Sequence, residues 1–262
     1  MLEDPLIYEM QVCLLYTSFM KILIIRHADP DYAADSLTPK GWREAGFLAE
    51  RLKEAKISAA YVSPLGRARD TASLTLKAIG LEAVLCPWLR EFDTHIWRPD
   101  VKNERKIAWD WLPADWTQEE RFFCYDQWAQ PKAMEEGKVK AEYDWVIKGL
   151  DEVLQRHGYI REEHYYRAVC ANNDTIAFFC HFGVECVLLS HLLNVSPMVL
   201  WHGVCAAPSS VTTLITEERR QGIAYFRMNG FGDISHLYAN NESPAFAARF
   251  CECFDNADER HE

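Results

Sequence analysis

The sequence contains no long apolar stretch and has few basic residues for its length. No apolar run approaches the roughly 18 residues that a helix needs to cross a bilayer. The chain has 28 lysines and arginines against 39 aspartates and glutamates, so its formal net charge is −11. Nucleic acids and membrane surfaces are largely anionic, so this balance argues against both as partners. It is compatible with a local basic pocket that binds a small anion.

Closely spaced cysteine pairs, which hold structural zinc in many proteins, are nearly absent. Nine cysteines are scattered along the chain, and only Cys251 and Cys253 lie close together, without a second pair. The spacing therefore predicts no metal site. The number of cysteines is odd and several stand inside apolar runs, which indicates reduced core thiols in a cytoplasmic protein.

The length and hydrophobic content of the chain favour one large globular domain. The chain has 262 residues, of which 49% are hydrophobic, and it shows no internal repeat. Residues 1–19 lack a basic leader and contain Glu3 and Asp4, so we expect a dispensable extension and not a signal peptide. We place the domain at residues 20–242 and expect a polar, fraying tail over residues 243–262.

The most informative stretch is a short apolar run that ends in charge. Lys21 to Ile25 is rich in isoleucine and leads directly into Arg26 and His27. A continuous aliphatic run is typical of a strand buried in a parallel sheet, and ligands bind at the carboxyl end of such strands. Arginine suits phosphate or carboxylate, and histidine can act as a nucleophile or base near neutral pH.

The periodicity beyond this strand predicts an α/β fold. The predicted helices cover about 39–55, 65–79, 141–157 and 183–193, and the predicted strands cover 21–26, 57–62, 82–87, 165–170, 175–180, 211–216 and 223–228. The β-α-β-α-β order at the start indicates a parallel sheet with right-handed crossovers. We therefore expect a three-layer α/β/α fold with a mainly parallel sheet. Tryptophan-rich residues 92–140 break the regularity and predict an inserted cap over the strand ends.

Polar residues that could perform chemistry follow several of these strands. They are Arg26, His27, Arg67, Glu91 and His181. Carboxyl ends of parallel strands meet at one edge of a sheet, so these five side chains should converge.

The motifs around these residues resemble the histidine phosphatase superfamily, the phosphoglycerate-mutase-like group. The resemblance covers Lys21 to about Met228, with the cap as the least matched part. The motifs are Arg26-His27 after an aliphatic strand, Leu37-Thr38-x-x-Gly41, Ser63-Pro64-x-x-Arg67-Ala68-x-x-Thr71-Ala72, the Glu91 segment and Cys180-His181-x-Gly183.

The resemblance implies a metal-independent phosphomonoester hydrolase that needs no cofactor and acts on a small phosphorylated substrate. His27 would be the nucleophile and form a phosphohistidine. Arg26, Arg67 and His181 would bind the phosphate oxygens, and Glu91 would be the general acid and then the base. Positive charge around the equatorial oxygens and an in-line nucleophile are what phosphoryl transfer needs.

Three alternatives accompany this interpretation. The chain lacks the extended mutase-type sequence after His27, which favours a phosphatase over phosphoglycerate-mutase-type phosphoryl transfer. A non-catalytic module that binds a phosphorylated ligand is disfavoured because all five catalytic positions are filled. A haloacid-dehalogenase-type phosphatase on Asp29 and Asp31 would need its aspartate directly after the strand, where Arg26 and His27 stand.

The sequence departs from the family pattern at Ala28, which replaces the usual glycine after the Arg-His pair. A residue in an ordinary backbone conformation tolerates the added methyl group of alanine.

Contacts to the rest of the substrate are less marked in the sequence. Pro208, Ser209 and Ser210 occupy the place where family members present a small polar residue, and Ser209 or Ser210 could either donate to phosphate or start a strand. Trp97 and Arg98 lie in the cap among further basic residues, which suggests a substrate with an additional anionic or planar part. The identity of that substrate and the oligomeric state are left open.

Overall fold

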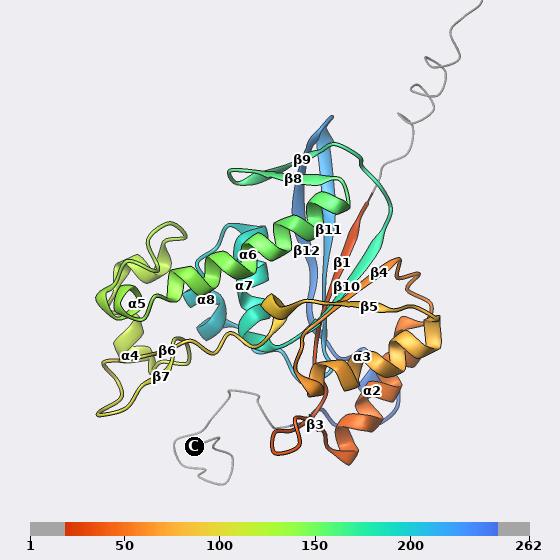
Figure 1. Cartoon of the computed structure of the whole chain (residues 1–262), viewed down its shortest axis with the longest axis horizontal. Helices are drawn as coiled ribbons and strands as arrows, with labels where there is room; N and C mark the ends of the chain where they lie inside the picture. Colours follow the sequence, from red (N-terminus) through yellow and green to blue (C-terminus); the bar gives the residue numbers. More distant parts are fainter. Residues whose placement is uncertain (1–18, 246–262) are drawn as a thin grey trace, which may run out of the picture.

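One mixed sheet of eight strands forms the centre of the computed structural model, which describes residues 19–245 (Figure 1). The strand order is β5-β4-β10-β1-β11-β12-β9-β8. The bounds are β1 Lys21–Arg26, β4 Ala59–Val62, β5 Ala83–Leu85, β8 Tyr159–Glu162, β9 Tyr165–Ala168, β10 Thr175–Cys180, β11 Val211–Arg220 and β12 Ile223–Asp233. Strands β5, β4, β10 and β1 run parallel, and the remaining pairs are antiparallel.

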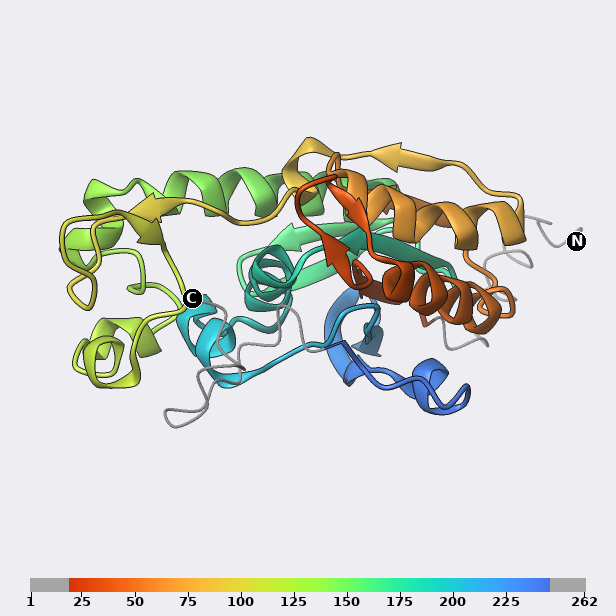
Figure 2. The same ribbon diagram turned by 90° about the horizontal axis from the view of Figure 1, so that it is seen from below.

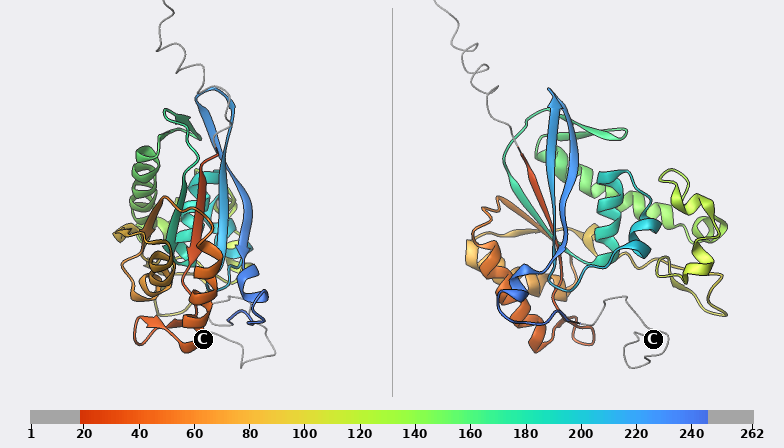
Figure 3. Two further views of the ribbon diagram at one scale, coloured as in Figure 1. Left: turned by 90° about the vertical axis from the view of Figure 1, so that its right-hand side faces the viewer. Right: turned by 180° about the vertical axis from the view of Figure 1, so that it is seen from behind.

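Helices cover both faces of this sheet, as the views in Figures 2 and 3 show. The longer helices are α2 Pro39–Leu52, α3 Gly66–Ile79, α6 Val139–Arg156, α7 Phe182–Leu193 and α8 Pro197–Gly203. Successive residues of β1 point to opposite faces and are buried on both. The three-layer α/β/α fold expected from the sequence is therefore confirmed.

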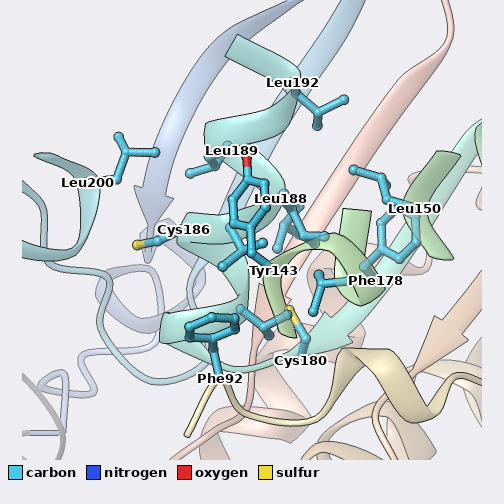
Figure 4. Packing of buried hydrophobic residues seen from close by; sticks show 14 of the residues in the cluster. Phe92, Tyr143, Leu150, Phe178, Cys180, Cys186, Leu188, Leu189, Leu192 and Leu200 are labelled. Carbon is cyan, nitrogen blue, oxygen red and sulfur yellow. The ribbon is translucent and has the colours of Figure 1, made fainter. Parts of the chain in front are cut away.

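The two faces carry separate apolar cores. Leu23 and Ile25 of β1 pack with Leu48 of α2 in one core. Ile22 and Ile24 belong to a second, larger core that includes residues of α6 and α7. Figure 4 shows its packing around α7, with Leu188 and Leu189 among the labelled side chains.

Local signals determine where the first helices begin and end. The Thr38 side chain accepts a hydrogen bond from Gly41 N at 3.0 Å, and Pro39 occupies the first helical position of α2. Helix α3 ends at Gly80, whose φ of +67° is a left-handed conformation that glycine adopts without strain. Both boundaries agree with the sequence-based expectation to within a few residues.

The inserted cap is irregular and held together by aromatic side chains. Its short elements are β6 His95–Ile96, β7 Lys106–Ile107, α4 Pro113–Trp116, η3 Glu120–Phe123 and α5 Lys132–Glu136. Trp128 is buried with its ring centroid 5.8 Å from that of Trp201 in α8, in an edge-on arrangement. Such pairs fix the cap to the body of the domain.

Some elements were not predicted. The charged edge strand β8 and the short helix α9, Ser235–Tyr238, carry no strong periodicity, and β11 and β12 extend beyond their apolar cores. The short strands β2 Pro30–Asp31 and β3 Ser36–Leu37, which pair with each other, were not predicted either. Residues 1–18 of the expected extension, residues 246–262 of the expected tail and with them the Cys251–Cys253 pair lie outside the described residues.

Candidate active site

The ends of β1 and β10 bring two histidines together. Arg26 and Cys180 are register partners, and His27 N donates to the Cys180 carbonyl at 3.0 Å. The ring centroids of His27 and His181 lie 5.1 Å apart. Both rings are buried, so one small group could contact both. This is the convergence that the strand order predicted.

The proton of His27 is placed by its own backbone. Nδ1 lies 2.8 Å from the Ala28 carbonyl oxygen, which can only accept a hydrogen bond. Nδ1 therefore carries the proton and Nε2 keeps its lone pair. Burial, together with the nearby charges of Arg26 and Arg67, holds the pKa of His27 well below its usual value. The ring is consequently neutral and nucleophilic near pH 7.

Two arginines flank this pair in different ways. Arg26 is buried, donates from Nη1 to the Ala206 carbonyl and lies 5.5 Å over the Phe182 ring. Arg67, at the start of α3, donates from Nη1 to Asp35 Oδ1 at 2.9 Å. The other oxygen of Asp35 accepts from Gly66 N at 2.7 Å, so Asp35 orients the Arg67 guanidinium. Buried Arg67 Nε has no hydrogen-bond acceptor among residues 19–245.

His181 is oriented by Ser63 at the end of β4. Ser63 Oγ lies 2.8 Å from His181 Nε2 and already accepts from Leu65 N at 3.3 Å. The hydroxyl has a proton to donate to Nε2, and in that arrangement the ring proton of His181 lies on Nδ1. That nitrogen is buried and has no acceptor within the described part of the chain. Arg67 Nε, and His181 Nδ1 in this tautomer, are thus donors suited to an anion.

Replacing Ser63 tests this arrangement. Because Ser63→Ala removes the donor to Nε2, we expect the tautomer preference of His181 to be lost and kcat/KM for phosphomonoesters to fall about tenfold, the equivalent of one hydrogen bond. Ser63→Thr, which keeps the hydroxyl, should retain most activity. Ser73→Ala on the exposed side of α3 is the control. Equal losses in the alanine and threonine variants would indicate a packing role instead.

Glu91 is held at the amino end of α7. Its Oε1 accepts from Phe92 N at 2.8 Å and from Val184 N at 3.2 Å. A Cβ on Gly183 would lie only 2.7 Å from that oxygen and 2.9 Å from Trp109 Cζ2, so glycine is required there. Burial raises the pKa of Glu91, although Phe92 N and Arg26 oppose the rise. A carboxyl with a raised pKa is suited to donating a proton near neutral pH.

The three suggested substrate contacts have different surroundings in the structure. Ser209 has φ +60°, and its Oγ is 3.0 Å from His236 Nε2, while its backbone N donates to the His27 carbonyl. Arg98 pairs with Asp100 and donates to the Trp109 carbonyl inside the cap. Trp97 is largely exposed. In the structure Ser209 and Arg98 therefore stabilise the protein through contacts with its own residues.

Several residues around the site were not identified as site residues. Ser63 stood in a motif but was taken only as the end of a strand. Asp35 and Tyr32 lay in a loop without a pattern. Glu185 is fully buried near Arg26, and burial raises its pKa to about 7. No local signal in the sequence marks a residue that acts through a partner many positions away.

The described residues also bear on metals and membranes. Within residues 19–245, no group of three or more His, Cys, Asp or Glu side chains could hold a metal ion. The same part of the chain has no helix with the length and apolar character needed to cross a membrane.

An α/β sheet with paired histidines and arginines beyond its strand ends defines a class of phosphate-handling proteins. A family model described as the histidine phosphatase superfamily (branch 1) matches residues 22–229. The chain belongs to this superfamily.

Curated relatives match the chain over shorter segments. A probable phosphoglycerate mutase of Cronobacter sakazakii is 29% identical over 102 residues, which are 34% of this chain and 47% of that protein. A protein of the same name from Photorhabdus laumondii is 35% identical over 81 residues, 28% of this chain and 38% of that protein. The alignments thus span less than half of each relative's length.

Solved structures resemble the fold over most of the chain. YhfR of Bacillus stearothermophilus aligns with a TM-score of 0.52 at 18% identity, covering 83% of this chain and 99% of that one. A phosphoserine phosphatase of Entamoeba histolytica in complex with 3-phosphoglyceric acid aligns with a TM-score of 0.52 at 17% identity. The alignment covers 83% of this chain and 99% of that one. A mycobacterial glucosyl-3-phosphoglycerate phosphatase aligns with a TM-score of 0.51 at 17% identity, and the alignment covers 81% of this chain and 98% of that one. These likenesses concern the fold.

Proposed function

We propose that this protein is a metal-independent phosphomonoester hydrolase that acts through a phosphohistidine on His27. The observation that carries the proposal is the proton placement. The Ala28 carbonyl holds the proton on Nδ1, and burial together with the charges of Arg26 and Arg67 keeps the His27 ring neutral, so Nε2 is available for attack.

The reaction follows from the positions of the surrounding groups. His27 Nε2 attacks phosphorus, an N–P bond forms, and the bond from phosphorus to the ester oxygen breaks. Protonated Glu91 gives its proton to the leaving oxygen. Ionised Glu91 then takes a proton from water, which attacks phosphorus and releases His27 and inorganic phosphate. Arg26, Arg67 and His181 Nδ1 donate to the equatorial oxygens, where charge is greatest in the transition state.

The names of the curated relatives support a second candidate, mutase-type transfer. There the phosphoryl group on His27 would return to a hydroxyl of the bound alcohol and not to water. The first half of both reactions is the same, so the residues above would keep their roles. The fate of the phosphoryl group distinguishes the two.

A panel of phosphomonoesters assayed with and without EDTA tests the proposal. We expect inorganic phosphate to be released at the same rate in both conditions, because no step needs a metal. Incubation with 3-phosphoglycerate should yield phosphate and not 2-phosphoglycerate. Isomer formation would establish the mutase, loss of activity in EDTA would contradict the mechanism, and tight binding without turnover would indicate a binding module.

A further inference from the structure

Tyr32 stands at the open side of the candidate site, where no role has been assigned to it. It follows β2 in the turn that leads to β3, and 61% of the residue is exposed. Its ring centroid lies 5.4 Å from Arg67 Cζ. The phenol also interacts electrostatically with Arg26 and Glu91. An aromatic ring is thus placed between solvent and the residues that would bind phosphate and protonate the leaving group.

The turn that carries Tyr32 is fixed to the site by polar contacts. Asp35 accepts from both Gly66 N and Arg67 Nη1, and Ser36 Oγ donates to Asp70 Oδ2 at 2.5 Å. These contacts join the turn to the first turn of α3. The ring is therefore presented by a braced segment, which lowers the entropy cost of stacking a ligand on it.

The charges near Tyr32 do not favour a second anionic group on the substrate. The cations that interact with His27 and His181 are Arg26 and Arg67, both beside the proposed phosphate position. Carboxylates of Asp35 and Glu91 lie next to them. A carboxylate on the leaving alcohol would therefore lie near the like charge of Asp35, and near that of Glu91 once Glu91 has given up its proton.

Two of the basic residues in and next to the cap are already paired with carboxylates. Arg98 forms an ion pair with Asp100, and Arg90 pairs with Asp93 and Glu142. The wall behind Glu91 is aromatic, since Trp109 packs beside the Glu91 carboxyl and against Phe182, with ring centroids 5.8 Å apart. Of the two substrate features suggested by the sequence, the structure favours the planar one over the anionic one.

We infer that Tyr32 determines substrate specificity by stacking on a planar, uncharged alcohol group of the phosphomonoester. The inference rests on the proposed function, because it assigns the substrate class of the same site. The ring of Tyr32 would cover one face of the leaving group while Arg67 supports the other face of Tyr32. Such aromatic contacts contribute about tenfold in affinity beyond the area they bury.

Three alkyl phosphates with similarly poor leaving groups test this inference through release of inorganic phosphate. They are 2-phenylethyl phosphate, propyl phosphate and 3-phosphoglycerate. We expect kcat/KM for 2-phenylethyl phosphate to exceed both others about tenfold, mainly through KM. Tyr32→Ala should remove that advantage and leave propyl phosphate within about twofold of the unmodified protein, whereas Tyr32→Phe should retain it.

Tyr165→Ala is the matched control, because Tyr165 is an exposed tyrosine on β9 near the far edge of the sheet. It should leave the ratio of the three substrates unchanged. Preference for 3-phosphoglycerate, or an unchanged ratio in Tyr32→Ala, would overturn the inference and leave the hydrolase proposal intact. Absence of phosphate release from every ester, including activated aryl phosphates, would overturn both.

Discussion

His27→Ala is expected to lower turnover of every phosphomonoester by at least about 10⁴-fold. The variant lacks the atom that would form the covalent bond to phosphorus, and the remaining donors can only bind the ester. Binding should persist, because Arg26, Arg67 and His181 keep their contacts. Rapid quench with a radiolabelled phosphate ester should trap an acid-labile phosphoenzyme in the unmodified protein and none in the variant.

His164→Ala provides the control for this experiment, because His164 is exposed beside Asn194 and lies in the turn between β8 and β9. The His164→Ala variant should form the radiolabelled phosphoenzyme and hydrolyse the ester at the same rate as the unmodified protein. A trapped phosphoenzyme in His27→Ala, or labelling that resists acid, would place the nucleophile elsewhere in the chain.

Glu91→Gln is expected to affect substrates according to their leaving groups. The amide cannot donate the proton that an alkoxide needs, so kcat/KM for alkyl phosphates should fall about 10²- to 10³-fold. Activated aryl phosphates depart without protonation, and their kcat/KM should change by less than about tenfold. The parameter kcat/KM is used because it covers only steps up to phosphoenzyme formation. Glu50→Gln, on the exposed side of α2, is the control.

The pH dependence gives an independent check on Glu91. The acid form is required for the first step, and burial raises the pKa of Glu91. The rate with alkyl phosphates should therefore fall as pH rises through that raised pKa, while the low pKa of His27 keeps the nucleophile neutral down to acidic pH. Glu91→Gln should abolish the high-pH decline. If both substrate types lose activity equally and the decline persists, Glu91 is not the acid.

Local patterns were sufficient to predict much of the fold. The isoleucine-rich β1 and the Thr38-Pro39 start of α2 are signals carried by a few adjacent residues, and the structure has both elements. Edge strand β8 was missed because its burial comes from packing against α6 and not from its own sequence. The lengths of β11 and β12 were underestimated because polar residues continue the pairing of a hairpin once its apolar part is paired.

Strand order and periodicity are local properties, so they were enough to predict that Arg26, His27, Arg67 and His181 stand at or just beyond the ends of strands in a parallel sheet. The contacts of each side chain, in contrast, depend on how the chain folds. The His181 tautomer depends on Ser63, which is 118 positions away in the chain. Arg98 pairs within the cap, and Tyr32 faces Arg67 across a braced turn. Hydrogen bonds and ion pairs form wherever folding places donors beside acceptors, and residue spacing along the chain does not record that placement.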